Sequence, residues 1–334
     1  MHDLKGPYLL YLGHEDRPLA IKTSRGIARW RPEICMGEHG SPLSLGLPKM
    51  RPAEAAERGA RTFVLGLTNT TGDIPDDWRQ DILDAVNAGM DIANGLHQRL
   101  SDVNEIRAAA EAKGIRLHDI RHQFGAVPIG TGAPRPGNRI LTVGTDCSVG
   151  KMYSALAIER EMRARGFNAE FRATGQTGIL IAGQGIPVDA VISDFVAGSV
   201  EKLCPAAAQD HWDVIEGQGS LFNPAYAGVS LGLLHGAQAD VLVMCHEAGR
   251  EEIKDKPGYP VPDLQDCIDT NLKMARLTNP RSKLGAISLS SQLIGREKTD
   301  ALCEELEHRF SVPCFDPMIH GTGKFVERLS CPAA

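Results

Sequence analysis

The sequence predicts an α/β fold in two domains, a small open sheet followed by a larger doubly wound parallel sheet. The chain has 334 residues, which suits about two domains with separate cores. Short apolar runs alternate with segments of helical spacing along the chain, as in proteins built from βαβ units. One stretch, Val127–Asn138, is dense in glycine and proline, and such residues interrupt helices and strands. We place the domain boundary there, between 1–136 and 137–334.

The first domain is expected to be a small Rossmann-like open sheet. Apolar runs rich in β-forming residues predict its strands, and helical spacing ended by Gly89 and Gly114 predicts its helices. The strands are expected at Tyr8–Leu12, Arg61–Leu67, Met90–Ala93 and Ile115–Ile120, and the helices at Asp77–Ala88 and Leu96–Lys113.

Two polar loops of this domain follow expected strands, where open α/β sheets bind ligands. They are Thr68–Gly72 and Asn94–His97. A polar turn selected for its backbone geometry is the simpler interpretation of either loop taken alone. Both are therefore candidate pocket loops only.

The second domain is expected to have the larger sheet, with helices on both faces. Its strands are apolar almost throughout, which is typical of parallel strands covered on both sides. We expect strands at Arg139–Val143, Asn168–Ala173, Ala190–Ile192, Asp213–Ile215, Asp240–Met244, Leu284–Leu289 and Val312–Phe315, and helices at Lys151–Arg165 and Thr299–Phe310.

Composition limits the classes of partner. Asp and Glu (42) outnumber Lys and Arg (36), giving a net charge of −6, and the charges are interspersed, so neither nucleic acid nor an anionic membrane is expected as a partner. The eight cysteines form no Cys-x-x-Cys pair, which predicts reduced thiols without a zinc ribbon. The chain opens with no leader pattern and has no run of about 18 apolar residues, so a cytoplasmic location is expected.

A glycine-rich loop carries the strongest functional signal. Gly144 and Gly150-Lys151, with five residues between the two glycines, follow an expected strand and precede an expected helix. This is the context that a phosphate-binding loop (P-loop) requires, although the usual pattern has four residues between its glycines. Glycines let backbone N–H groups turn inward, the helix N-terminus adds partial positive charge, and lysine supplies a cation. The predicted phosphate ligands are the loop residues Gly144, Thr145, Asp146, Cys147, Ser148, Val149, Gly150, Lys151 and Met152. The second domain is therefore expected to be similar to P-loop NTPases.

The last loop position departs from the pattern of nucleotide hydrolases. Ser or Thr there normally gives its hydroxyl to Mg²⁺, and this chain has Met152. A thioether is a poor ligand for a hard cation. Either another group holds the metal, or the loop binds a phosphate whose bonds stay intact. A carrier such as coenzyme A would fit the second possibility, because its chemistry takes place at a distant thiol.

Two resemblances suggest an activity. Gly144–Lys151 together with Glu216–Ser220 resembles dethiobiotin synthetase, which activates a carboxylate with ATP. The whole chain resembles a P-loop family long described as being of unknown function, whose characterised members include D-glutamate N-acetyltransferases. The segments that carry this resemblance are Asn94–His97, Asp194–Glu201 and Glu216–Gly219.

The second resemblance implies transfer of an acetyl group from acetyl-CoA to a small acidic amino acid, D-glutamate, without a metal. An ATP- and Mg²⁺-dependent ligase or kinase is the alternative, and a nucleotide-sensing module without catalysis is another. A homo-oligomer is expected, because closed oligomers are common among enzymes.

Acetyl transfer to an amine needs a base and cations for the substrate carboxylates. Glu216 follows an expected strand beside the loop and is the first candidate base, although it could instead order the loop or a metal-bound water. His246 is the second candidate base. Arg250, Arg172 and Gln176 are the predicted substrate ligands. Histidine spacing suggests no metal site.

Overall fold

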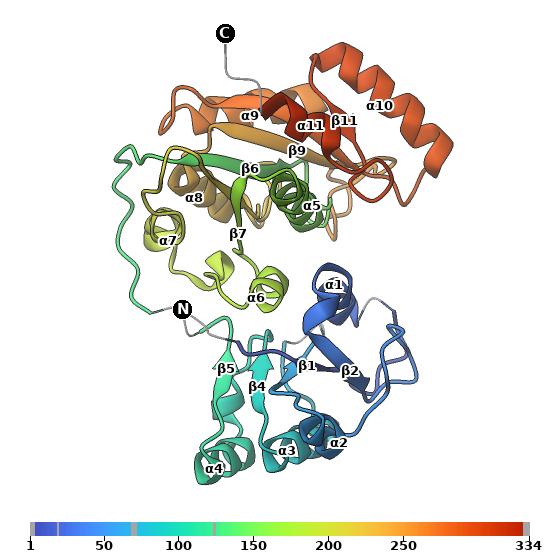
Figure 1. Cartoon of the computed structure of the whole chain (residues 1–334). Coiled ribbons are helices and arrows are strands. Elements are labelled where there is room, and N and C mark those ends of the chain that lie inside the picture. The colour runs from blue at the N-terminus through green and yellow to red at the C-terminus, as the bar shows by residue number, and fades with distance from the viewer. Residues whose placement is uncertain (1–3, 19, 68–71, 123–124, 330–334) are drawn as a thin grey trace. The chain divides into compact units, whose positions relative to one another are not determined.

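The computed structural model describes residues 4–18, 20–67, 72–122 and 125–329, and these form two compact units (Figure 1). The first unit joins Met1–Gly125 to Gly175–Ala190, and the second joins Ala126–Thr174 to Val191–Ala334. In the described ranges, no helix is both long and apolar enough to cross a bilayer.

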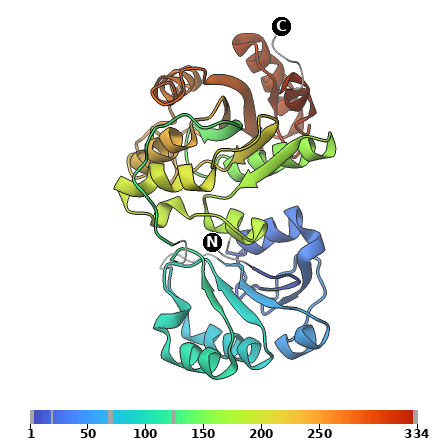
Figure 2. The same cartoon turned by 60° about the vertical axis from the view of Figure 1, so that its left-hand side comes forward.

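The first unit is built on a parallel sheet of order β2-β1-β3-β4-β5. Helices α2, α3 and α4 pack side by side, as both views show (Figure 1 and Figure 2). The strands are β1 (Tyr8–Tyr11), β2 (Cys35–His39), β3 (Thr62–Leu65), β4 (Asp91–Asn94) and β5 (Leu117–Asp119), and the helices are α1 (Lys22–Trp30), α2 (Pro52–Glu57), α3 (Arg79–Asn87), α4 (Asn104–Lys113) and α6 (Gln176–Ala182).

Helix α6 joins this unit from a distant part of the chain. It packs against α1, and Thr23 Oγ1 lies 3.1 Å from Thr177 Oγ1. Arg121 forms an ion pair with Asp189 and donates from Nε to the Gly95 carbonyl at 2.9 Å. The segment after β7 therefore completes the first unit.

The second unit is built on a parallel sheet of order β11-β10-β9-β6-β8-β7. Helix α5 packs on β6, β7 and β8, while α8 packs on β6 and contacts α7 and α9 (Figure 1). The strands are β6 (Asn138–Gly144), β7 (Asn168–Arg172), β8 (His211–Ile215), β9 (Val241–Glu247), β10 (Lys283–Ser290) and β11 (Cys314–Phe315), and the helices are α5 (Lys151–Ala164), α7 (Val196–Leu203), α8 (Ala227–Ala237), α9 (Leu264–Ala275), α10 (Arg296–Phe310) and α11 (Gly323–Leu329).

The predicted fold class is confirmed: an α/β chain with a Rossmann-like sheet followed by a P-loop sheet. β6 is an inner strand of the larger sheet, with β8 on one side and β9 on the other. The carboxyl ends of these three strands therefore meet beside the loop that follows β6.

Two predicted elements are wrong. Ala190–Ile192 is not a strand. A 3₁₀ turn ends at Ala190, and Ile192 is 71% exposed, so the apolar side chain that suggested a buried strand lies at the surface. The predicted helix Leu96–Lys113 begins only at Asn104. Backbone amides before Asn104 donate to side chains instead of to helix carbonyl groups. Leu96 N donates to Asn94 Oδ1 at 2.9 Å, and Leu100 N donates to Asp119 Oδ1 at 2.8 Å.

Candidate functional site

The glycine-rich loop lies where β6 ends and α5 begins. Gly144 could not carry a side chain, since a Cβ there would lie 2.8 Å from Val149 Cγ2 and 3.2 Å from the Cys245 carbonyl oxygen. Gly150, the residue before α5, has φ of +92°, a conformation that glycine adopts at little cost. Local geometry therefore requires both glycines of the motif.

The backbone amides at the end of this loop point to no protein acceptor. Within the residues that the structure describes, the backbone N–H groups of Val149, Gly150, Lys151 and Met152 donate no hydrogen bond to a protein acceptor. Consecutive amides at a helix N-terminus form an anion-binding concavity, because their dipoles and that of the helix add. The loop thus fits a phosphate group.

The side chain of Lys151 turns back toward the loop. Its side chain is nearly buried, and Nζ donates to the Asp146 carbonyl oxygen at 2.7 Å. Burial lowers the pKa of Lys151, since desolvation disfavours the ammonium ion. An anion in the concavity would favour the charged form.

Asp146 is fully buried and holds the loop together. Its carboxylate accepts from Asn223 Nδ2 at 2.9 Å, from Arg250 Nη1 at 2.8 Å and from Lys254 N at 2.7 Å. Burial alone would raise the pKa of Asp146, but these hydrogen bonds, and one from the Cys147 amide, hold it below its ordinary value. Asp146 is therefore ionised and ties two distant segments to the loop, one with Asn223 and the other with Arg250 and Lys254.

Arg250 reaches the loop from its carbonyl side. It donates to the Cys147 carbonyl oxygen at 2.7 Å and to that of Ser148 at 3.3 Å, and it forms ion pairs with Asp146 and Glu247. Its donors are thus engaged by the protein, which fits a role in fixing the loop better than capture of a substrate carboxylate. That predicted role as a substrate ligand stays a proposal.

The two candidate bases lie at the carboxyl ends of the strands that flank β6. His246, near the end of β9, has Nδ1 3.1 Å from Thr145 Oγ1, and burial and Arg250 lower its pKa, so the imidazole is neutral. Glu216 follows β8 and is 4% exposed, and its Oε2 accepts from Thr174 N at 3.0 Å.

The other two predicted substrate ligands do not touch the loop. Arg172, at the end of β7, donates to Asp213 Oδ1 at 2.6 Å and pairs with Glu170 Oε1 at 2.9 Å. Burial would lower its pKa, but these acids raise it on balance. Gln176 begins α6 in the first unit, where it approaches Gly95 closely.

The candidate pocket loops of the first domain are only partly described. Thr68–Thr71 lie outside the described residues. In Asn94–His97, the Asn94 side chain donates to the Gln98 carbonyl oxygen at 2.7 Å and to Asp119 Oδ1 at 3.0 Å. These bonds support the interpretation of this loop as a turn fixed by its own side chains.

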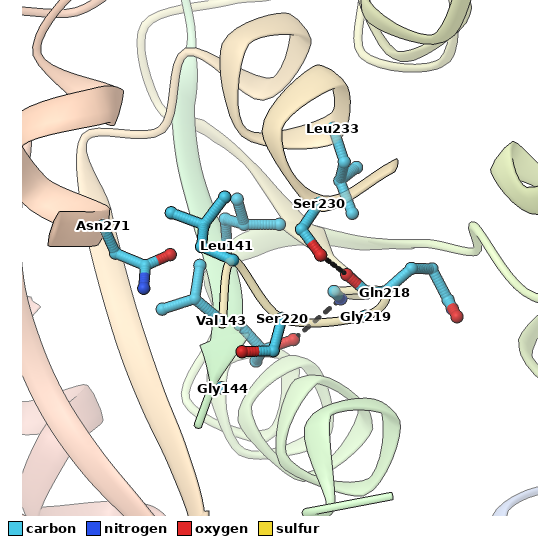
Figure 3. Close-up of a pocket in the computed structure, with 12 residues that line it drawn as sticks. Leu141, Val143, Gly144, Gln218, Gly219, Ser220, Ser230, Leu233 and Asn271 are labelled. Carbon is cyan, nitrogen blue, oxygen red and sulfur yellow. Dashed lines mark hydrogen bonds between the residues drawn. The ribbon is translucent and has the colours of Figure 1, made fainter. Parts of the chain in front are cut away.

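The loop after β8 is held between β6 and α8 (Figure 3). Ser230 Oγ donates to the Gln218 carbonyl oxygen at 2.9 Å, and Gly217 N donates to Thr142 Oγ1 at 2.9 Å. Leu141, Val143, Leu233 and Asn271 line a cavity of about 10 Å³ beneath it, which is the size of a single water molecule. This cavity is too small for a substrate.

Sequence reasoning missed three residues that touch the loop. Asn223 and Lys254 bind Asp146, and Ser220 Oγ donates to the Thr145 carbonyl oxygen at 3.0 Å. Ser220 lies within the Glu216–Ser220 segment, so its position gave a signal. Asn223 and Lys254 gave none, because ordinary loop residues surround them in the sequence.

The described residues contain no group of three or more His, Cys, Asp or Glu side chains placed to hold a metal ion. Met152 stands where a P-loop hydrolase presents a hydroxyl to Mg²⁺.

Cys147 is an unsuitable nucleophile, because burial raises its pKa even though Lys151 lies near.

Two family profiles cover most of the chain. One, a P-loop domain of unknown function (DUF1611_C), matches residues 128–326, and the other, a Rossmann-like domain of unknown function (DUF1611_N), matches residues 35–123. The chain belongs to the DUF1611 family. A solved DUF1611 structure, from Anabaena variabilis, has a TM-score of 0.86 and 27% identity, and the match covers 97% of this chain and 98% of that one.

Two relatives match nearly the whole length of the chain. One, from Tritonibacter scottomollicae, is 46% identical over 98% of this chain and 99% of its own. The other, from a Pseudoalteromonas species, is 44% identical over 98% of this chain and 99% of its own. Both are named D-glutamate N-acetyltransferase.

Proposed function

We propose that this chain is an N-acetyltransferase that moves the acetyl group of acetyl-CoA to the amino group of D-glutamate. The observation that carries the proposal is the full-length similarity, at 44% and 46% identity, to two relatives of that name. The open amides of the loop and Met152 agree with it, since they suit a phosphate that is bound but not cleaved.

In this proposal the loop binds the pyrophosphate of coenzyme A. The amides of Val149–Met152 would donate to phosphate oxygens, and Lys151 would turn from the Asp146 carbonyl oxygen toward them. Arg250 and Asp146 would keep the loop rigid, because they hold its carbonyl side. A rigid cradle loses less entropy when it binds.

His246 is the base that the geometry favours. In the tautomer in which Nδ1 donates to Thr145 Oγ1, Nε2 presents its lone pair, and the lowered pKa keeps it available at neutral pH. It would take a proton from the ammonium group of the acceptor. The freed amine would attack the thioester carbon, and the tetrahedral intermediate would expel the coenzyme A thiolate. The nitrogen would give its second proton to this thiolate, which leaves the neutral amide and coenzyme A.

This assignment has a geometric requirement. The pantetheine arm separates the thioester from the pyrophosphate, so the arm must fold back for the acetyl group to reach a base beside the loop. Glu216 has the same requirement and is nearly buried. We therefore assign Glu216 to holding Thr174 and keep it as the second candidate base.

The test is calorimetric titration with acetyl-CoA and, separately, with ATP and Mg²⁺, combined with release of free coenzyme A in the presence of D- or L-glutamate. Acetyl-CoA should bind, and D-glutamate should accelerate coenzyme A release. Lys151→Ala should weaken acetyl-CoA binding about 100-fold, because charge-assisted hydrogen bonds to phosphate are lost.

Other outcomes separate the alternatives. Preference for ATP with Mg²⁺ and turnover of ATP would support the ligase or kinase instead. Tight nucleotide binding without turnover of either donor would support a sensing module. Acetyl-CoA binding that Lys151→Ala leaves intact would place the donor away from this loop.

A further inference from the structure

We propose that Lys254 forms a subsite for the ribose 3′-phosphate of coenzyme A, at the outer rim of the phosphate loop. This inference rests on the proposed function, because it assumes a coenzyme A donor. It adds a residue that distinguishes this donor from ATP and from other pyrophosphate carriers.

Lys254 is fixed to the loop at two points. Its backbone N–H donates to Asp146 Oδ2 at 2.7 Å, and its ammonium Nζ donates to Ser148 Oγ at 3.0 Å. Ser148 has a left-handed φ of +56° and lies between the buried acid and the start of α5. The ammonium is therefore held against the loop at the Ser148 hydroxyl.

The Lys254 ammonium lies beside the loop without an acidic partner among the described residues. Arg250 pairs with Asp146 and Glu247, and Lys151 is buried inside the loop. In the described part of the chain, no carboxylate lies within ion-pair distance of the Lys254 ammonium, whose recorded partner is the neutral Ser148 hydroxyl. An anionic ligand could bind there without displacing an acid.

The chemistry of coenzyme A calls for such a group. Its pyrophosphate can occupy a cradle of consecutive amides, but its third phosphate is attached to the ribose and cannot enter the same cradle. A phosphomonoester carries a charge of about −1.5 to −2 at neutral pH, so it needs a cation of its own. An ammonium beside a hydroxyl supplies a charge and a second hydrogen-bond donor. ATP has no phosphate at the 3′ position of its ribose and would lack this contact.

The test compares coenzyme A with 3′-dephospho-coenzyme A in calorimetric titrations. The wild type should bind coenzyme A about tenfold more tightly, since one charge-assisted contact is missing with the dephospho form. Lys254→Met removes the ammonium but keeps the backbone N–H that supports Asp146. It should weaken coenzyme A binding about tenfold and leave 3′-dephospho-coenzyme A unchanged.

Two further variants control the comparison. Lys256→Met removes a nearby lysine of the same segment, for which the structure records backbone hydrogen bonds only, and it should retain the wild-type preference. Lys254→Arg keeps the positive charge and should retain most of the preference for coenzyme A over 3′-dephospho-coenzyme A.

Equal affinity of the wild type for the two ligands, or an equal loss of both in Lys254→Met, would overturn the subsite and leave the proposed function standing. Failure of the wild type to bind either ligand would overturn the proposed function, and the subsite with it.

Discussion

The two sheets of this protein are both parallel, yet their carboxyl edges differ. After β6, the chain leaves the amides of Val149–Met152 without protein acceptors. After β4, the side chains of Asn94 and Asp119 accept from the next amides, at 2.9 Å and 2.8 Å. The comparison teaches that the backbone amides at a sheet edge are available to an anion only where the protein itself supplies no acceptor for them.

A buried acid stabilises each edge, but from a different side. Asp119 bonds directly to the amides and side chain of the turn after β4. Asp146 binds groups outside the loop, on Asn223, Arg250 and Lys254. The first arrangement closes the turn on itself, and the second keeps the loop open toward a ligand.

The largest expected effect concerns the base. His246→Gln should lower kcat for acetyl transfer about 1000-fold, because a general base contributes about that much, while coenzyme A affinity changes little. In the wild type, kcat/KM should fall with acid only below pH 6.5, since the pKa of His246 is lowered from that ordinary value and the neutral form is the active one. Steady-state rates across pH measure both effects.

Glu216→Gln is the matched comparison for this prediction. It keeps the shape of the side chain and removes its basicity. Near-normal turnover in His246→Gln together with collapse in Glu216→Gln would transfer the role of base to Glu216.

Asp146→Asn should destabilise the protein by about 3 kcal/mol, because it removes the buried carboxylate that compensates the charge of the half-buried Arg250 guanidinium. Urea unfolding measures this loss. The pKa of Asp146 is held below its ordinary value of 3.8, so its contribution is present above that pH and disappears as the pH falls through the lowered value. The difference between variant and wild type should shrink accordingly. A constant difference down to pH 2 would contradict an ionised Asp146.

Asn94→Ala should have the smallest effect, a loss of about 2 kcal/mol of stability, because it removes hydrogen bonds to Leu96, Gln98 and Asp119 in a buried turn. Coenzyme A affinity should stay the same, since the acceptors of the first unit have no part in the phosphate loop. A marked loss of coenzyme A affinity would show that the two edges are not independent.

The sequence by itself determined the phosphate loop, its flanking elements and the class of fold. These features depend on short-range patterns: an apolar strand, two glycines that local geometry requires, and the helix that follows. For the same reason, the predicted strand Arg139–Val143 lies within β6, and the predicted strand Asp240–Met244 overlaps β9. The positions of Glu216 and His246 beside the loop follow from parallel strands that end at one edge.

Only the tertiary structure decided the rest. Helix α1 has no side-chain cap at its start, and β2 contains Gly37 and Glu38, so neither gives a strong local signal; partners elsewhere in the unit stabilise them. The turn at Leu96 and the assignment of α6 to the first unit likewise depend on residues distant in sequence. The hydrogen bonds from Asn223, Arg250 and Lys254 span 77 to 108 positions to Asp146. Such bonds form only once the sheet brings those segments together, so no local sequence pattern predicts them.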